Sequence, residues 1–280
     1  MTTRPPDAHP AGRRGAHRAP VSAARRIAVV AVLVLAVGIA GVLLLVRPWS
    51  QSDDAAEPAP TSAGVAPDVV QWLEEELPPD TPVTAADDVR AALAAAGSGD
   101  RVGTTDPGAL QVVAGEPPEG DLVVARFEGA GGATLSVVDP APGRPTAEEL
   151  DRRMGLAEAV LANPVAGVTG RSADVLRDGD IDARLLGLLA GLVARMDVHV
   201  ADLPPAPGQP SDGRPARRVL VDQAAGEPLT PGAGATDDLV AFLEAQRPPF
   251  APDSVEQTDD GVLVAFDYVS APDALVTAAT

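Results

Sequence analysis

The sequence contains no cysteine among its 280 residues. Without a thiol, the chain has no disulfide framework, no thiolate metal site and no cysteine nucleophile. Lysine is absent as well, so all 21 basic residues are arginine, and aromatic residues make up only 2% of the chain. The few aromatic residues that occur at helical spacing, such as Trp72, are expected to lie in a core.

Histidine is also scarce, and His199 is the only histidine after residue 66. A serine nucleophile usually needs a neighbouring base, and a zinc site usually needs three protein ligands, often histidines. No G-x-S-x-G motif occurs; the nearest segment, 170–174, lacks the second glycine. These absences disfavour a serine hydrolase and a zinc enzyme, and we expect His199 to have a structural role in a strand.

Residues 27–46 contain no charged or strongly polar side chain. A helix of that length matches a hydrocarbon core of roughly 30 Å, which predicts a transmembrane helix. Six arginines and one acidic residue precede it in residues 1–26, so the positive-inside rule places the N-terminus in the cytoplasm and the rest of the chain outside. A signal peptide cleaved near residues 50–52 is the alternative, although 27–46 is longer than a typical signal core of roughly 7–15 residues.

The remainder of the chain is strongly acidic. Residues 48–280 hold 39 aspartates or glutamates against 14 arginines. Nucleic acids and anionic lipids bind to basic surfaces, so this charge excludes nucleic acid as an expected partner. The acidic surface is typical of an exported domain that must stay soluble.

From residue 67 onward, helical and strand patterns alternate, which predicts an α/β layered domain. Thr146 and Glu149 form a capping box, and the sequence Asp259-Asp260-Gly261 is typical of a hairpin turn. The expected helices cover 67–77, 85–96 capped by Thr84, 146–162, 181–196 and a helix capped by Thr236 that ends before Pro248; the expected strands cover 81–84, 110–113, 122–127, 133–138, 197–201, 217–222, 254–258 and 262–268.

Asp178, Asp180 and Asp182 place carboxylates at alternate positions, as calcium sites often do. The segment departs from an EF-hand loop because its sixth position is Ala183 rather than glycine and its twelfth is Leu189 rather than glutamate. The other interpretation is that these aspartates cap the helix over 181–196. Calcium is therefore the one cofactor that the sequence leaves open, with these three aspartates as candidate ligands.

Two segments resemble parts of known actinobacterial proteins. Residues 69–97, with the pattern W-L-x-x-x-L-P-P-x-T, resemble a helix–strand–helix unit in the extracytoplasmic parts of actinobacterial membrane proteins, including glycosyltransferase-like ones. Residues 176–204 are similar to a helix-to-strand unit of exported actinobacterial proteins, some of them peptidoglycan zinc peptidases, but the metal-ligand motifs of those enzymes are missing here. The resemblance implies a family of single-pass, membrane-anchored actinobacterial proteins and transfers no catalytic residue.

Together these observations predict a membrane-anchored extracytoplasmic binding or scaffold module that works beside cell-envelope proteins and is not an enzyme. The bilayer and another envelope membrane protein are the expected partners. The alternative is an envelope hydrolase or transferase that uses carboxylates, with or without a divalent metal. The predicted organisation is a cytoplasmic tail over 1–26, a transmembrane helix over 27–46, a linker over 47–66, an α/β domain over 67–271 with a lobe boundary near 164, and a tail over 272–280.

Overall fold

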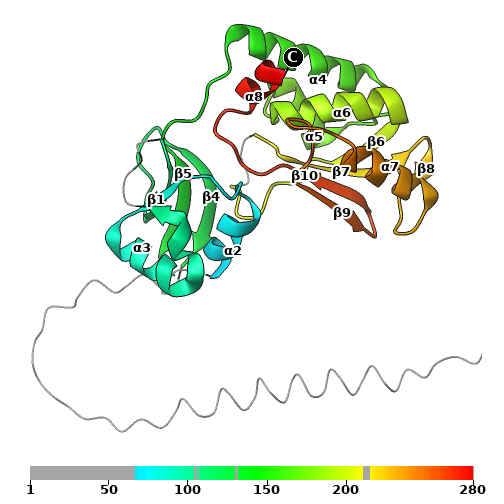
Figure 1. Ribbon diagram of the computed structural model, residues 1–280. Coiled ribbons are helices and arrows are strands. Elements are labelled where there is room, and N and C mark those ends of the chain that lie inside the picture. Colours follow the sequence, from blue (N-terminus) through cyan, green and yellow to red (C-terminus); the bar gives the residue numbers. More distant parts are fainter. Residues whose placement is uncertain (1–66, 104–105, 107, 130–131, 211–214, 280) are drawn as a thin grey trace, which may run out of the picture. The chain divides into compact units, whose positions relative to one another are not determined.

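The computed structural model describes residues 67–103, 106, 108–129, 132–210 and 215–279. These residues form an α/β fold with two five-stranded sheets and seven α-helices (Figure 1). The predicted fold class, which joined a transmembrane helix to an α/β domain, is corrected in one respect. No helix among the described residues is long and apolar enough to cross a membrane, and residues 27–46 lie outside the described residues.

The first sheet has the strand order β2-β1-β3-β5-β4. Strand β1 runs parallel to β2 and β3, whereas β5 is antiparallel to both β3 and β4. β4 is therefore an edge strand, and its pairing with β5 shifts by one residue between Val123 and Ala125. The strands are β1 (Val83–Ala85), β2 (Val102–Gly103), β3 (Leu110–Ala114), β4 (Leu122–Glu128) and β5 (Thr134–Asp139).

The helices of this half are α2 (Pro67–Glu75) and α3 (Asp87–Leu93). Apolar residues of both helices join the sheet in one core, because their side chains recur at helical spacing and face the alternate inward residues of the strands. This first core contains Trp72, Leu73 and Leu93 from the helical side and Leu110 and Val137 from the sheet. A π-helical turn (Ala94–Ser98) and a 3-10 turn (Gly99–Arg101) lead from α3 to β2.

The second sheet is antiparallel, with the order β6-β7-β10-β9 and the short β8 paired with β7. The strands are β6 (Val198–Asp202), β7 (Arg218–Ala224), β8 (Glu227–Pro228), β9 (Ser254–Thr258) and β10 (Gly261–Ala265). Alternate residues of β7 and β10 point to one face, where Val219, Val221, Val262 and Val264 are fully buried.

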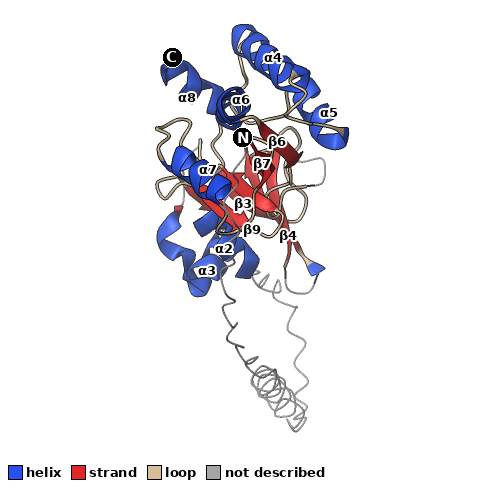
Figure 2. Cartoon of the chain, turned by 90° about the vertical axis from the view of Figure 1, so that its right-hand side faces the viewer, coloured by secondary structure: helices blue, strands red, loops and turns tan. Residues whose placement is uncertain are grey.

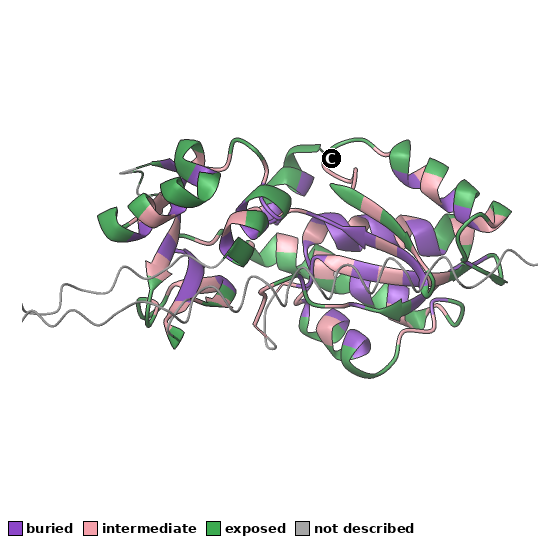
Figure 3. Ribbon diagram, turned by 90° about the horizontal axis from the view of Figure 1, so that it is seen from below, coloured by how far each residue is buried: buried purple, intermediate pink, exposed green. Residues whose placement is uncertain are grey.

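Helices cover that buried face (Figure 2). They are α4 (Ala147–Ala162), α5 (Gly170–Asp178), α6 (Ala183–Met196) and α7 (Gly234–Glu244), and the chain ends in α8 (Pro272–Ala279). The inner side of α6 is a run of buried leucines, which explains why its apolar segment is a core helix of this domain rather than a membrane span. Figure 3 shows the resulting alternation of buried and exposed positions along the helices and strands.

Several local sequence signals are confirmed. The hydroxyl of Thr146 accepts from the Glu149 amide, and the Glu149 carboxylate accepts from the Thr146 amide, so the capping box begins α4 as predicted. Gly261 has a φ of 140°, and a Cβ there would lie 2.2 Å from the Val221 carbonyl oxygen. The hairpin between β9 and β10 therefore needs glycine both for its backbone angle and for its close approach to β7.

Other local predictions were wrong. Thr84 lies in β1, where its hydroxyl donates to the Leu110 carbonyl, and α3 begins after Ala86 without a side-chain cap. Thr236 lies inside the first turn of α7 and donates to the Thr230 carbonyl. Residues 272–280 were expected to be a tail, but 272–279 form α8, held by the ion pair between its Asp273 and Arg153.

The described residues make one compact unit with two apolar cores. The chain leaves the first core after β5 and enters the second in α4, and Tyr268 returns to the first core after β10. The Tyr268 hydroxyl donates to the buried Asp139 carboxylate over 2.7 Å, and the Tyr268 amide donates to the Glu76 carbonyl over 2.8 Å. Polar contacts of this kind join the segments that carry the two sheets.

Candidate functional site

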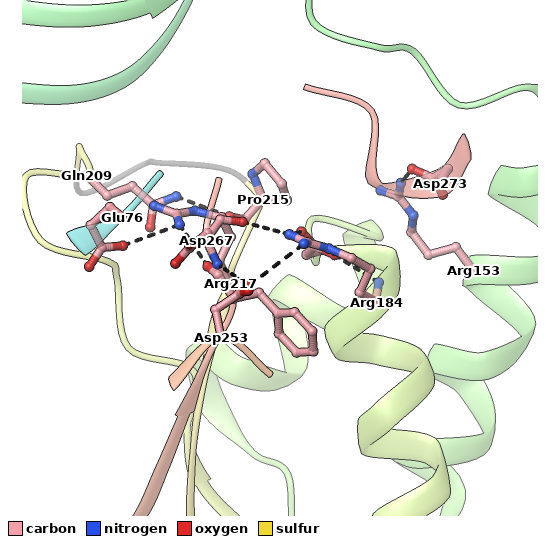
Figure 4. A network of polar contacts seen from close by, with 11 residues as sticks. Glu76, Arg153, Arg184, Gln209, Pro215, Arg217, Asp253, Asp267 and Asp273 are labelled. Atoms are coloured by element: carbon pink, nitrogen blue, oxygen red, sulfur yellow. Dashed lines mark hydrogen bonds and ion pairs between the residues drawn. The ribbon is translucent and has the colours of Figure 1, made fainter. Parts of the chain in front are cut away.

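A buried cluster of charged side chains lies where α2, the start of β7 and the end of β10 meet (Figure 4). Glu76 and Arg217 are 5% and 1% exposed, respectively. One Glu76 carboxylate oxygen accepts from Arg217 over 3.3 Å, and the other accepts from Arg218. Both oxygens of Glu76 are thus held by guanidinium groups, as a buried carboxylate requires.

Arg217 is the centre of this cluster. Its guanidinium donates to the Phe266 carbonyl over 2.9 Å and lies 5.7 Å from the centre of the Tyr268 ring. Its Nη2 atom is buried and has no hydrogen-bond partner among the described residues. Burial lowers the pKa of Arg217, because the protein replaces only part of the water that would solvate its charge.

A second arginine extends the cluster toward α6. Arg184 pairs with Asp182 over 2.8 Å, donates to the Asp267 carbonyl over 2.7 Å and lies 3.9 Å from Asp253. In Figure 4, Glu76 approaches Arg217 from one side and Arg184 lies on the other. The Asp267 amide donates to Asp253 over 2.8 Å, which keeps these two aspartates close.

The pKa of the Asp267 carboxyl is raised to about 6. Burial is the main cause, and the negative charges of Asp253 and Glu76 add to it, while Arg217 and Arg184 oppose it. Asp267 therefore titrates closer to neutrality than an ordinary aspartate. The pKa of Tyr268 is raised by burial and by its bond to Asp139, so its hydroxyl stays protonated and acts as a donor.

Glu76 also lines a cavity of about 520 Å³ between α2, the edge strand β4 and residues 207–208. A volume of this size falls within the range of roughly 300–1,000 Å³ that is typical of ligand sites. The cavity is lined by Asp68, Gln71, Trp72, Glu75, Glu76, Arg126, Phe127, Glu128, Pro207 and Gly208. We refer to it as the α2–β4 cavity.

Two aromatic rings form the wall of the α2–β4 cavity. Trp72 and Phe127 are in edge-to-face contact, with ring centres 6.3 Å apart. The Trp72 indole donates to the Pro207 carbonyl over 2.9 Å, and the Arg126 amide donates to the Gly208 carbonyl over 2.7 Å. Gly208 has a φ of 68°, and a Cβ there would lie 2.7 Å from the Phe127 ring. The wall is therefore fixed by hydrogen bonds and by a residue that must be glycine.

The rim of the cavity is acidic. Asp68, Glu75 and Glu128 are exposed, and within the described part of the chain no ion pair joins them to an arginine. Arg126 is the one basic side chain among the described residues of the lining, whereas the charge of Glu76 is offset by Arg217 and Arg218. Three carboxylates against one arginine leave the lining with a net negative charge, which favours a cationic group over an anion.

Two further cavities give weaker indications of a ligand site. A cavity of about 620 Å³ lies at the carboxyl ends of the parallel strands β1 and β3, where open α/β sheets often bind ligands. Its wall includes Asp106, which is flanked by residues that the structure does not describe. A groove of about 400 Å³ between α4 and α5 is lined mainly by aliphatic side chains around Met154 and Leu161.

The structure places the three candidate calcium ligands at different points. Asp178 ends α5, Asp180 follows the turn after it, and Asp182 is the N-cap of α6, where it accepts from the Arg184 amide and pairs with the Arg184 side chain. The capping role predicted for Asp182 is confirmed. Within the described residues, no group of three or more histidines, aspartates and glutamates is arranged to hold a metal ion.

His199 lies in β6 as expected, and its Nδ1 is 2.6 Å from the Asp222 carboxylate in β7. Its ring approaches Gly167 so closely that a Cβ at that position would meet it at 2.2 Å. The side chain thus packs between a neighbouring strand and the segment before α5, which agrees with a structural role.

No local sequence pattern indicates the α2–β4 cavity. Trp72 was expected to be buried, and it is 2% exposed, but its pairing with Phe127 joins residues from separate elements. The contact between Trp72 and Pro207 spans 135 positions, and no local pattern signals it. The one sequence feature related to the acidic rim is the excess of acidic residues in 48–280. Comparison of the chain with protein-family models, with curated proteins and with solved structures finds no match.

Proposed function

We propose that this protein is a binding or scaffold module that holds another protein through the α2–β4 cavity. The observation that carries the proposal is the fixed aromatic wall of this cavity beside three rim carboxylates that have no ion-pair partner in the described residues. Rigid aromatic side chains in a pocket with a polar rim are typical of the energetic centres of protein interfaces.

The same proposal places the partner at the cell envelope. This part rests on the resemblance of residues 69–97 and 176–204 to segments of exported actinobacterial proteins. The α2–β4 cavity draws one wall from the first of these segments, since Trp72 and Glu76 belong to it. A site built on that helix would link the resemblance to a binding role.

Affinity purification of the full chain with an N-terminal tag tests the proposal. Three chains are compared: the natural sequence, a rim variant with Asp68→Asn, Glu75→Gln and Glu128→Gln, and a control variant with Asp237→Asn, Asp238→Asn and Glu244→Gln. The control makes the same charge change at exposed positions of α7. We expect a stoichiometric partner to co-purify with the natural and control chains but not with the rim variant. Equal recovery with all three chains would contradict the proposal.

A carboxylate-dependent envelope hydrolase or transferase is the second candidate. It is favoured by Asp267, whose amide donates to Asp253 and whose pKa is raised to about 6, mainly by burial, as suits a general acid. Turnover of muropeptides or wall glycans, measured with and without calcium, would support it if Asp267→Asn abolished the reaction. A turnover that survives Asp267→Asn would assign the reaction to other residues.

A further inference from the structure

The outer edge of β4 lies along the α2–β4 cavity; Gly208 bonds to it at Arg126, and among the described residues it is free at Glu128. The Arg126 amide donates to Gly208, outside the sheet, so Arg126 does not use this group to bond β5. Because the backbone groups of a strand alternate in direction, the amide and carbonyl of Glu128 face the same outer edge. The Gly129 amide donates to Ala133, as this alternation requires.

Unpaired backbone groups at a sheet edge are a template for another extended chain. A peptide residue that exchanges both hydrogen bonds with Glu128 would sit at the mouth of the cavity. Its two neighbours would then direct their side chains toward the opposite face, on which Phe127 meets Trp72 of α2. Those neighbours would contact Phe127, the more exposed of the two rings, and the carboxylates of Asp68 and Glu75.

We infer that the α2–β4 cavity takes an arginine or lysine side chain of an extended peptide segment that pairs with the free edge of β4 at Glu128. This inference rests on the proposed binding function and names its ligand class. A cation against the half-buried Phe127 ring and beside the rim carboxylates is favourable, and the site would repel an acidic segment. Residues 48–280 hold 39 acidic residues against 14 arginines, and we assign the basic segment to the partner protein of the proposed function.

The test uses the full chain with Trp49→Phe, which leaves Trp72 as its only tryptophan. The probe is an acetylated, amidated heptapeptide in which three arginines alternate with four threonines. The first comparison peptide replaces each arginine by citrulline, which keeps the shape and removes the charge. The second is methylated on the backbone nitrogens of the central residues, which removes their hydrogen-bond donors. Binding is followed by Trp72 fluorescence and by calorimetry.

We expect the arginine peptide to bind at least tenfold more tightly than the citrulline peptide and the methylated peptide. The rim variant should bind it at least tenfold more weakly than the natural sequence, and the α7 control variant should match the natural sequence within twofold. Equal binding of the arginine and citrulline peptides would overturn the cationic ligand class. Equal binding of the methylated peptide would overturn the strand pairing, and an equal loss in the α7 variant would overturn the assignment to this cavity.

The result can be separated from that of the proposed function. If the purified partner depends on the rim carboxylates while the arginine peptide does not bind, this inference fails and the binding function stands. If neither the partner nor the peptide depends on the rim, both fail.

Discussion

The residue on which the charged cluster depends most is Glu76. Its carboxylate accepts from two arginines, one of which is 1% exposed and has a guanidinium nitrogen without a partner in the described residues. A buried ion pair adds little stability compared with apolar residues of the same shape, but removal of one partner leaves a buried charge uncompensated. The cluster is therefore much more sensitive to a single substitution than to its complete replacement.

Glu76→Ala is expected to lower the free energy of unfolding by about 3 kcal/mol, because Arg217 would keep only the Phe266 carbonyl as an acceptor in the described part of the chain. Denaturation by urea measures this loss. Asp174→Ala is the control, since it removes the exposed pair between Asp174 and Arg177 and should cost less than about 0.5 kcal/mol. A similar, small cost for both variants would show that the cluster is not energetically important.

Asp267 makes stability depend on pH. Its pKa is raised from 3.8 to about 6 in the folded chain, so between these values the folded state binds more protons than the unfolded state. The contribution of Asp267 is therefore most favourable below about pH 4 and is lost as the pH rises to about 6. The charged carboxylate is partly exposed, and solvent screening reduces its cost at neutral pH to about 1 kcal/mol.

Asp267→Asn removes this titration. We expect the variant to be about 1 kcal/mol more stable than the natural sequence at pH 7 and to lose that advantage as the pH falls to 4. Urea denaturation of both chains at a series of pH values measures the difference. Glu244→Gln, at an exposed position of α7, should stay within about 0.3 kcal/mol of the natural sequence throughout. An advantage of Asp267→Asn that grows toward pH 4 would contradict the assigned direction.

At the scale of single elements, α6 shows how two glycines of one motif can have different roles. Gly187 and Gly191 lie about one helical turn apart in α6. In the structure, a Cβ on Gly187 would meet the Phe250 ring at 2.6 Å, whereas a Cβ on Gly191 would have no neighbour within 4 Å. Gly187 is thus required by a side chain from the loop after α7, and Gly191 is not required by packing.

Gly191→Ala is expected to raise the free energy of unfolding by about 0.5–1 kcal/mol, because alanine has the higher helix propensity and the space is open. Gly187→Ala should gain nothing or lose stability, since the Phe250 ring must move. Thermal or urea denaturation of the two single variants compares them directly. The same gain in both would show that Phe250 adapts without cost.

The elements could be predicted from the sequence where their signals are local. The capping box of α4, the β9–β10 hairpin and the leucine-rich α6 all follow from residues within a few positions of one another. The helix α5 was missed because few of its residues are apolar, and α8 was taken as a tail because it is held by a long-range contact between Asp273 and Arg153. The two predicted threonine caps failed because each hydroxyl bonds elsewhere. Thr84 donates to the Leu110 carbonyl in β3, and Thr236 donates to the Thr230 carbonyl before α7.

The site was harder to predict than the elements. The α2–β4 cavity joins a helix, a strand edge and a loop that are separated by as many as 135 positions. Its charged residues are ordinary surface acids in the sequence, and only the position of α2 against β4 sets three of them around an aromatic pair. By contrast, Asp182 was a prominent candidate, and its role as a helix cap needed only its immediate neighbours.

At the scale of the whole molecule, the described residues contain two apolar cores that share polar contacts rather than a continuous apolar layer. Glu76 of the first half is held by Arg217 and Arg218 of the second, and Tyr268 follows the second sheet but packs in the first core. A substitution that removes one of these contacts should therefore destabilise both cores, even when it removes no apolar side chain from either core.

Tyr268→Phe tests this coupling. The substitution keeps the ring in the first core but removes the hydroxyl that donates to Asp139. This carboxylate is 1% exposed and, among the described residues, would keep only the Ala141 amide as a donor. An unsatisfied buried acceptor costs about 1–3 kcal/mol.

In a chain that also carries Trp49→Phe, Trp72 fluorescence reports the first core, and far-ultraviolet circular dichroism reports mainly the helices of the second. We expect the two probes to give coincident transitions that shift together to lower urea concentration. Leu275→Ala, which trims a side chain that is 44% exposed on α8, should leave both midpoints nearly unchanged. A shift of the fluorescence transition alone would show that the two cores unfold independently.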